Sequence, residues 1–328
     1  MEILLLFERE IRGLIGPNEA RPVVRDAFAK LARGEAILAG VINLDIPESR
    51  AEVHVKGAHL RATPFFSIKV ASGSYDNPAR GLPVGSGMFL VFDATTGFPR
   101  AVLFDNGYLT ELRTGAAGAV AADLLARMDI ERVGIVGVGS QARYQLEALL
   151  GVRTPERVIA YGRSEPKAIA YAKEMEERHG VQVLPAKTVE QAVRGSDVVV
   201  TVTPSKEPLV RAEWVLPGMH ITAVGSDGPD KQELDVGVLA KADKVVADRL
   251  DQCLRLGEIH HAVEAGVLTR DRVYAELGAI VAGSKPGRER DEEITVADLT
   301  GVGVQDAAVA NVVVDEALRR GLGKVLDI

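Results

Sequence analysis

The residues that most directly indicate a chemistry form one glycine-containing loop, Gly137-Val138-Gly139-Ser140-Gln141-Ala142. In this G-x-G-x-x-A pattern, Gly137 permits a tight turn, Gly139 lets the backbone approach a pyrophosphate, and Ala142 keeps helix and sheet close. The helix N-terminus, at Ser140 and Gln141, offers backbone N–H groups to phosphates. Alone, such a motif also arises as a chance turn. Because this one lies between a predicted strand and a predicted helix, it predicts a dinucleotide site.

The end of the next predicted strand indicates which dinucleotide is bound. That strand ends in Tyr161-Gly162-Arg163-Ser164, with no acidic residue to bind the ribose 2′-hydroxyl of NAD. Arg163 and Ser164 can instead hold a 2′-phosphate, by charge and by hydrogen bond. The alternative is a solvated loop arginine. The pattern therefore favours NADP(H) over NAD.

Two basic residues in the N-terminal half of the chain are candidates for holding an anionic substrate. Lys69 lies in the predicted strand 66–70, where period-two alternation puts it on the same face as Ser67. It is either an edge lysine or a functional one inside a cleft. Arg113 precedes a run of small residues and can bind a carboxylate with two hydrogen bonds; the alternative is a surface arginine.

Asp227 is the candidate for exchanging a proton with a substrate nitrogen. It follows the apolar strand that ends at Val224 and lies in the sequence Gly225-Ser226-Asp227-Gly228. Doubly wound sheets bind ligands at the carboxyl ends of their strands, and an acid there can act as a proton donor or acceptor. An Asx turn beside glycine is the alternative.

Metal and disulfide chemistry are not expected. His260 and His261 are adjacent, so on a helix they point in different directions and do not form an i, i+4 ligand pair. Cys253 is the single cysteine and has no partner for an intramolecular disulfide or a cysteine-based zinc site.

The elements that must position these residues fall into two blocks. The first block combines a helix at 17–34, a helix at about 110–128 and several short runs rich in β-branched or aromatic residues. The predicted strands are 41–44, 51–56, 65–70, 88–93 and 101–105. This pattern is typical of an α+β domain.

In the second block, short apolar runs alternate with helical patterns. Helices are predicted at about 141–150 and 166–179. The predicted strands are 132–136, 158–161, 181–184, 198–202, 220–224 and 244–247. Such alternation predicts βαβ units in a doubly wound parallel sheet of the Rossmann type. The last segment, 300–322, reads as a glycine turn and a helix, which we expect to return to the first block.

Composition bounds these interpretations. The chain has 328 residues and a net charge of −7, from 39 Lys and Arg against 46 Asp and Glu. The acidic balance argues against a dedicated nucleic-acid binder, and no stretch approaches the ~20 apolar residues of a membrane span. Met1 to Phe7 is apolar but has no basic flank or cleavage site, so we expect a cytoplasmic protein.

Several sequence blocks together resemble the ornithine cyclodeaminase/μ-crystallin family. Their order and spacing match that family over nearly the whole chain. The blocks are Ile68–Val70, Asn77–Pro83, Tyr108–Thr114, Gly137–Ala142, Gly225–Asp227 and Asp298–Asp306.

The resemblance implies a homodimer built from two domains. Residues 1–118 and 300–328 are expected to form a discontinuous α+β domain for substrate binding and dimerisation, and 119–299 an NAD(P)-binding Rossmann domain. Lys69 and Arg113 match residues that bind the substrate carboxylate, and Asp227 matches a proton donor or acceptor.

The predicted cofactor contacts extend beyond the glycine loop. By resemblance, Thr114 contacts a cofactor phosphate. Further expected contacts follow a predicted strand or lie in or near the blocks above: Thr203, Ser226, Lys231, Val302 and Gly303.

One departure from the family pattern bears on the substrate. Cyclodeaminases carry an early arginine for the carboxylate, whereas the corresponding stretch here has Asn43 and no arginine. His54 and Lys56, in the segment that follows, share one face of a strand. They can bind a second carboxylate, as in iminosuccinate, or form a solvated strand face.

These residues favour an NAD(P)H-dependent reductase of a small imino acid, either a ketimine or iminosuccinate reductase or an alanine or aspartate dehydrogenase. The alternative is a lyase with bound NAD, either an ornithine cyclodeaminase or a cis-3-hydroxyproline dehydratase. A third possibility is a non-catalytic cofactor-dependent binder. Retention of Lys69, Arg113 and Asp227 argues against it.

Overall fold

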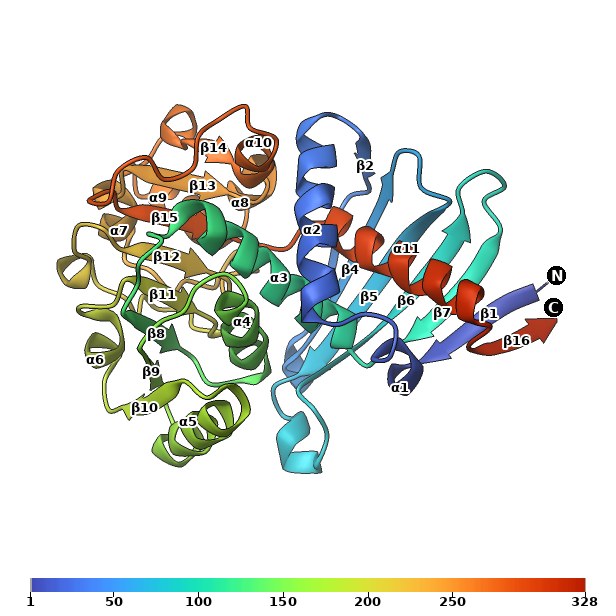
Figure 1. Cartoon of the computed structure of the whole chain (residues 1–328), viewed down its shortest axis with the longest axis horizontal. Helices are drawn as coiled ribbons and strands as arrows, with labels where there is room; N and C mark the ends of the chain where they lie inside the picture. The colour runs from blue at the N-terminus through green and yellow to red at the C-terminus, as the bar shows by residue number, and fades with distance from the viewer. Residues whose placement is uncertain (1, 328) are drawn as a thin grey trace. The chain divides into compact units, whose positions relative to one another are not determined.

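The computed structural model describes residues 2–327 and divides into two compact units (Figure 1). Unit 1 combines the chain up to Arg113 with the chain from Val302 onward, and unit 2 is Thr114–Gly301. Among the described residues, no helix is long and apolar enough to cross a membrane.

Unit 1 is built on an eight-stranded sheet of order β16-β1-β7-β6-β5-β4-β2, with β3 paired to β4. Its pairs are antiparallel except β1 with β7. The strands are β1 (Glu2–Phe7), β2 (Ala36–Leu38), β3 (Ile42–Ile46), β4 (Ala51–Leu60), β5 (Phe65–Ser74), β6 (Gly85–Asp93), β7 (Pro99–Phe104) and β16 (Lys324–Asp327). The sequence analysis missed β1, β2 and β16. Of these, β1 and β16 owe their pairing to partners at the opposite end of the chain.

Two long helices cover one face of this sheet and lie side by side across it (Figure 1). They are α2 (Pro17–Ala32) and α11 (Gly303–Arg320), and α11 packs on β4 and β5. Val302, Val304 and Ala307 join Ala27 and Ala58 in their shared core. The C-terminal segment thus returns to the first block. The remaining helical turns are α1 (Glu8–Ile11), the 3₁₀ segments 47–49 and 77–80, and the start of α3 (Tyr108–Leu125).

Unit 2 contains a fully parallel eight-stranded sheet of order β10-β9-β8-β11-β12-β15-β13-β14. The strands are β8 (Arg132–Val136), β9 (Arg157–Tyr161), β10 (Gln182–Ala186), β11 (Val198–Thr201), β12 (His220–Ala223), β13 (Lys244–Ala247), β14 (Ala275–Glu276) and β15 (Thr295–Asp298). The sequence analysis missed β14 and β15. The direction of winding reverses between β8 and β11, which defines the ligand edge of such sheets.

Hydrophobic cores lie on both faces of this sheet. Val198 and Val200 of β11 point into one core with helices α4 and α5, and Val199 points into the other, which α6, α7 and α9 line. The helices are α4 (Ser140–Leu150), α5 (Glu165–His179), α6 (Val189–Val193), α7 (Val236–Lys241), α8 (Leu250–Cys253), α9 (Gly257–Glu264) and α10 (Leu277–Val281), with 3₁₀ turns at 212–214 and 270–272. The predicted doubly wound parallel sheet is confirmed.

Candidate active site

Two lysines face each other on the helix-covered side of the unit 1 sheet. Lys56 of β4 and Lys69 of β5 are direct partners in the antiparallel register. Both are buried, Lys69 to 2% exposure and Lys56 to 7%. Lys69 is therefore not an edge lysine, because β5 lies between β4 and β6 in the interior of the sheet. Buried like charges side by side require a compensating anion.

Asp306, in the first turn of α11, supplies that anion. Its Oδ2 lies 3.2 Å from the Lys69 ammonium and its Oδ1 lies 2.8 Å from Nε of Arg113. Arg113 also donates from Nη1 to Oε1 of Gln305, at 2.8 Å. Arg113 is thus buried and doubly anchored, not a surface arginine. Sequence reasoning missed Asp306 and Gln305 as functional candidates, although both belong to the last family block, 298–306.

The charges of this cluster perturb one another. Burial lowers the pKa of Lys69 to about 7, and the positive charges of Arg113 and Lys56 act in the same direction, against the attraction of Asp306. Burial also opposes the charge on Asp306, but Arg113, Lys69 and Lys56 outweigh it and hold its pKa below the usual value. Burial raises the pKa of nearby Asp105, against hydrogen bonds from backbone N–H groups. Lys69 is therefore able to exchange a proton near neutrality.

Several donors in the cluster are not used by the protein. Within residues 2–327, Asp306 is the single anionic group at ion-pair distance from the Lys69 ammonium. The hydrogen bond of Arg113 in the same range comes from Nη1, and neither its Nε nor Nε2 of the fully buried Gln305 has a hydrogen-bond partner there. Buried donors are normally satisfied. The arrangement can therefore accept an anionic ligand such as a carboxylate.

His54 lies on the same face of β4 as Lys56 but is engaged by polar neighbours. Its Nδ1 is 2.9 Å from Oδ1 of Asn43, its register partner on β3, and its Nε2 is 3.4 Å from Oε2 of Glu52. Asn43, in the stretch that lacks the early arginine, thus contacts His54. Glu52 and Asn43 therefore compete with any ligand for the His54 ring.

The glycine loop of unit 2 has the geometry expected for a pyrophosphate. Gly137 has φ of +108°, and a Cβ there would lie 2.7 Å from the carbonyl oxygen of Val202, so a side chain is excluded. At Gly139, the residue before α4, a Cβ would meet nothing within 4 Å. Ala142 is fully buried against the sheet. The open space above Gly139 and the start of α4, at Ser140 and Gln141, therefore fits a phosphate group.

A buried carboxylate joins the loops that follow β11 and β12. Glu233 accepts hydrogen bonds from Oγ1 of Thr201 at 2.7 Å, from the N–H of Thr203 at 2.6 Å and from the N–H of Gly225 at 2.8 Å. Burial raises the pKa of Glu233 to about 7 against these bonds. Glu258 in turn accepts from the N–H of Glu233 at 2.8 Å. Sequence reasoning missed both acids, because nothing in their local pattern separates them from surface acids.

Asp227 lies beyond β12 at this same edge and is half-exposed. It forms an ion pair with Lys231, whose Nζ is 2.9 Å from Oδ1. The backbone oxygen of Lys231 accepts from the Ser226 hydroxyl and lies 2.8 Å from Nε2 of His261. The Asp227 side chain is thus held by a cation, beyond what an Asx turn requires, and the predicted residues Ser226, Asp227 and Lys231 form one connected group.

The other predicted cofactor residues range from exposed to fully buried. Arg163 is exposed at the end of β9, and Ser164 precedes α5 without capping it through its side chain. The Thr114 carbonyl accepts a hydrogen bond from Nε2 of Gln145, at 2.9 Å. In unit 1, the Val302 side chain is in the core and Gly303 is buried, so both have mainly backbone groups to offer a ligand.

His260 and His261 approach each other more closely than their sequence positions suggested. Together with Glu264 they bring one possible metal-ligand atom each within 4.8 Å of one another. Ring nitrogens of both histidines are already near backbone oxygens, of Leu254 and Lys231. The absence of a metal stays a prediction.

The sequence of this chain is similar to those of several known proteins. The sequence model of the ornithine cyclodeaminase/mu-crystallin family matches residues 2–321. An alanine dehydrogenase of Archaeoglobus fulgidus is 43% identical over 98% of both chains. An uncharacterised cyclodeaminase of Sinorhizobium fredii is also 43% identical over 98% of both chains. An iminosuccinate reductase of Paracoccus denitrificans is 35% identical over 99% of this chain and all of that one.

Solved structures agree with these matches. An archaeal alanine dehydrogenase dimer with bound NAD superposes with a TM-score of 0.93, at 41% identity over the full length of both chains. A Δ1-pyrroline-2-carboxylate reductase of Thermococcus litoralis, in complex with NADH and L-proline, superposes with a TM-score of 0.94 at 33% identity, covering 98% of this chain and 99% of that one. This chain therefore belongs to the ornithine cyclodeaminase/mu-crystallin family.

Proposed function

We propose that the chain catalyses the NAD(P)H-dependent reduction of a small imino acid to an amino acid. The observation that carries this proposal is the buried cluster of Lys69, Arg113 and Gln305, whose unused donors fit a substrate carboxylate. The glycine loop of unit 2, with open space at Gly139, fits the cofactor pyrophosphate. The relatives named alanine dehydrogenase and iminosuccinate reductase support the same reaction class.

The proposed reaction adds a hydride to the imine carbon and a proton to the nitrogen. NAD(P)H held at the glycine loop would supply the hydride. Arg113 binds the substrate carboxylate through Nη2 and so fixes the orientation of the imine. Lys69, whose pKa is about 7, donates the proton to nitrogen. Asp227, at the ligand edge of unit 2, is the alternative proton donor.

The charge of the cluster supports a substrate with two carboxylates. Three cations, Lys56, Lys69 and Arg113, face two carboxylates, Asp306 and Asp105. Burial raises the pKa of Asp105. A second substrate carboxylate would bring further negative charge to these basic side chains. We propose iminosuccinate as the first substrate to test, with Lys56 and His54 binding the additional carboxylate.

The lyase alternative has one specific observation in its favour. The relative from Sinorhizobium fredii is described as an uncharacterised cyclodeaminase. Such a reaction uses bound NAD without net change. Turnover of ornithine or cis-3-hydroxyproline with constant NADH would support it, and the absence of an arginine from the stretch 39–47 weighs against it.

The proposed function is tested by NAD(P)H oxidation with three imines: iminosuccinate, Δ1-pyrroline-2-carboxylate and the imine formed from pyruvate and ammonia. We expect turnover of at least one. Lys69→Ala should lower kcat/KM by ~10²-fold or more, because it removes the proposed proton donor. Lys173→Ala, at an exposed lysine of α5, is the control and should match the wild type. Oxidation with none of the three imines would refute the proposal.

We propose that NADPH is preferred, since residues 162–164 directly after β9 include no acid and the exposed Arg163 can bind a 2′-phosphate. Arg163→Ala should raise KM for NADPH by ~10-fold and leave KM for NADH nearly unchanged. Arg194→Ala, at an exposed arginine beyond α6, serves as the matched control. Steady-state kinetics with both cofactors decides. Equal effects of Arg163→Ala on the two cofactors would exclude a 2′-phosphate contact.

We propose that the protein is a homodimer in which unit 1 supplies the interface. The sheet face opposite Lys69 is apolar: by strand register it carries the stacked rings of Phe66 and Phe92, at 4.9 Å, and of Phe7 and Phe104, at 5.6 Å. Exposed apolar faces of this kind are typical of protein interfaces. The archaeal alanine dehydrogenase structure is itself described as a dimer.

Sedimentation measurements test the dimer. The wild type should sediment as a dimer at micromolar concentration, and Phe66→Asp should shift it towards monomer because it places a charge in the apolar face. Phe98→Asp, in the exposed turn between β6 and β7, is the control and should remain dimeric. A monomeric wild type would contradict the assignment.

A further inference from the structure

We infer that Asp306 is a positioning residue for the proposed reduction, holding Lys69 and Arg113 at the spacing that one substrate carboxylate and its imine nitrogen require. The inference rests on the proposed function and adds to it a residue that touches neither substrate nor cofactor. It stands on the geometry of the cluster, in which one buried carboxylate bridges two cations from different elements.

The two oxygens of Asp306 bind different partners. Oδ1 lies against Nε of Arg113, and Oδ2 lies against the ammonium of Lys69. Because Asp306 contacts Nε, Nη2 of Arg113 stays available for a ligand. A carboxylate that contacted both Nη1 and Nη2 would occupy Nη2 instead. Without Asp306, the two cations would repel each other in a buried setting, and their side chains would turn apart.

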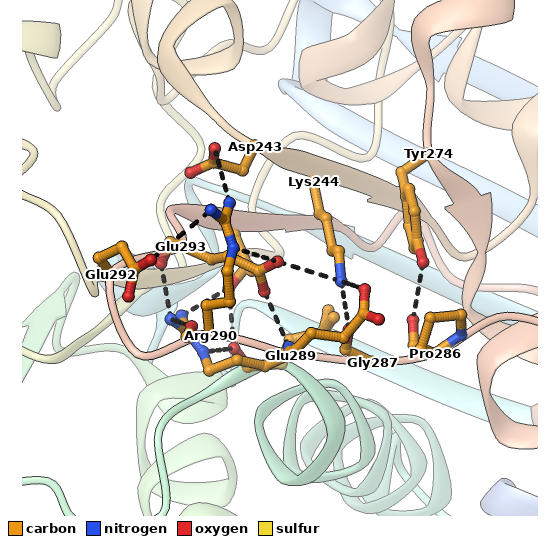
Figure 2. Close-up of polar contacts among 12 residues, drawn as sticks. Asp243, Lys244, Tyr274, Pro286, Gly287, Glu289, Arg290, Glu292 and Glu293 are labelled. Atoms are coloured by element: carbon orange, nitrogen blue, oxygen red, sulfur yellow. Dashed lines mark hydrogen bonds and ion pairs between the residues drawn. The ribbon is translucent and has the colours of Figure 1, made fainter.

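A second buried lysine shows what a purely structural ion pair looks like in this chain. Lys244 of unit 2 contacts the carbonyl oxygen of Gly287 at 2.6 Å, Glu289 at 2.7 Å and Glu293 at 3.3 Å (Figure 2). Burial opposes its charge, but Glu289 and Glu293 outweigh that effect and raise its pKa. Three protein partners therefore satisfy the Lys244 ammonium.

Lys69 differs from Lys244 in the number of its partners and in the direction of its pKa shift. Asp306 is its one carboxylate partner at ion-pair distance in the described residues, and its pKa falls to about 7. Two ammonium protons remain for a ligand. Asp306 thus keeps the Lys69 ammonium in place and available as an acid. It does not satisfy all the hydrogen-bond donors of that ammonium, as the three partners of Lys244 do.

Gln305 provides an internal comparison. It contacts Arg113 through Oε1 but makes no contact with Lys69. Loss of Gln305 should weaken carboxylate binding without changing the titration of Lys69. Loss of the Asp306 charge should change both, because its two oxygens serve both cations.

The test compares Asp306→Asn, Gln305→Ala and the wild type in pH profiles of kcat/KM. Wild-type kcat/KM should fall above pH about 7, as Lys69 loses its proton. The negative charge of Asp306 raises the pKa of Lys69, so Asp306→Asn should move this fall to lower pH by ~1 unit and raise KM ~10-fold. Gln305→Ala should raise KM and leave the profile in place. Lys56→Met should move the profile the opposite way, because the positive charge of Lys56 lowers the pKa of Lys69.

The direction of the KM change separates positioning from simple charge balance. Asp306→Asn makes the cluster more positive. If Asp306 only balanced charge, the variant would therefore bind an anionic substrate more tightly than the wild type does. An unchanged pH profile or a lower KM in Asp306→Asn would overturn the inference. Glu293→Gln removes a buried carboxylate partner of Lys244 and is the matched control for stability; it should lower the unfolding midpoint without changing KM or the profile.

A binding measurement keeps the inference testable if no imine is turned over. Calorimetric titration with succinate, a plain dicarboxylate probe, should show ~10-fold weaker binding to Asp306→Asn than to the wild type at pH 8, and a smaller difference at pH 6. Equal or tighter binding to the variant at pH 8 would refute positioning, whatever the enzyme reduces. NADH affinity should be equal in both proteins, which confirms that the variant is folded.

Discussion

The structure of unit 1 depends on one buried interaction, the bridge from Asp306 to Lys69 and Arg113. Two cations cannot share a dry interior without an anion between them. That anion comes from α11, near the end of the chain, whereas Lys69 and Arg113 come from its N-terminal half. The return of α11 onto β4 and β5, and with it the discontinuity of unit 1, is therefore what completes the basic cluster.

Unit 2 also contains a buried carboxylate, which holds two loops at the edge of its sheet. The loops after β11 and β12 expose backbone N–H groups at the edge of the sheet, and Glu233 accepts two of them inside the protein. This carboxylate is itself supported by Glu258 through the backbone. Buried carboxylates thus fix the loops at the ligand edge of unit 2 and orient the cations of unit 1.

Local pattern predicted much of this arrangement. The loop at Gly137, the strand 244–247 and the shared face of Ser67 and Lys69 could be read from spacing, because each depends on neighbours in sequence. The strands β1 and β16 could not, since they pair with each other across the whole chain. The roles of Asp306 and Glu233 were missed for the same physical reason: burial and distant partners, not residue type, separate them from ordinary surface acids.

In the proposed reaction, a hydride is transferred to the imine carbon of a substrate that Lys69 and Arg113 hold. The most direct measurement uses NADPH or NADH carrying deuterium at both C4 positions, with mass spectrometry of the amino acid formed. If hydride is transferred to the imine carbon, the product will carry one deuterium at its α-carbon, and one cofactor molecule will be oxidised for each product molecule. An amino acid formed without deuterium, or without oxidation of the cofactor, would contradict it.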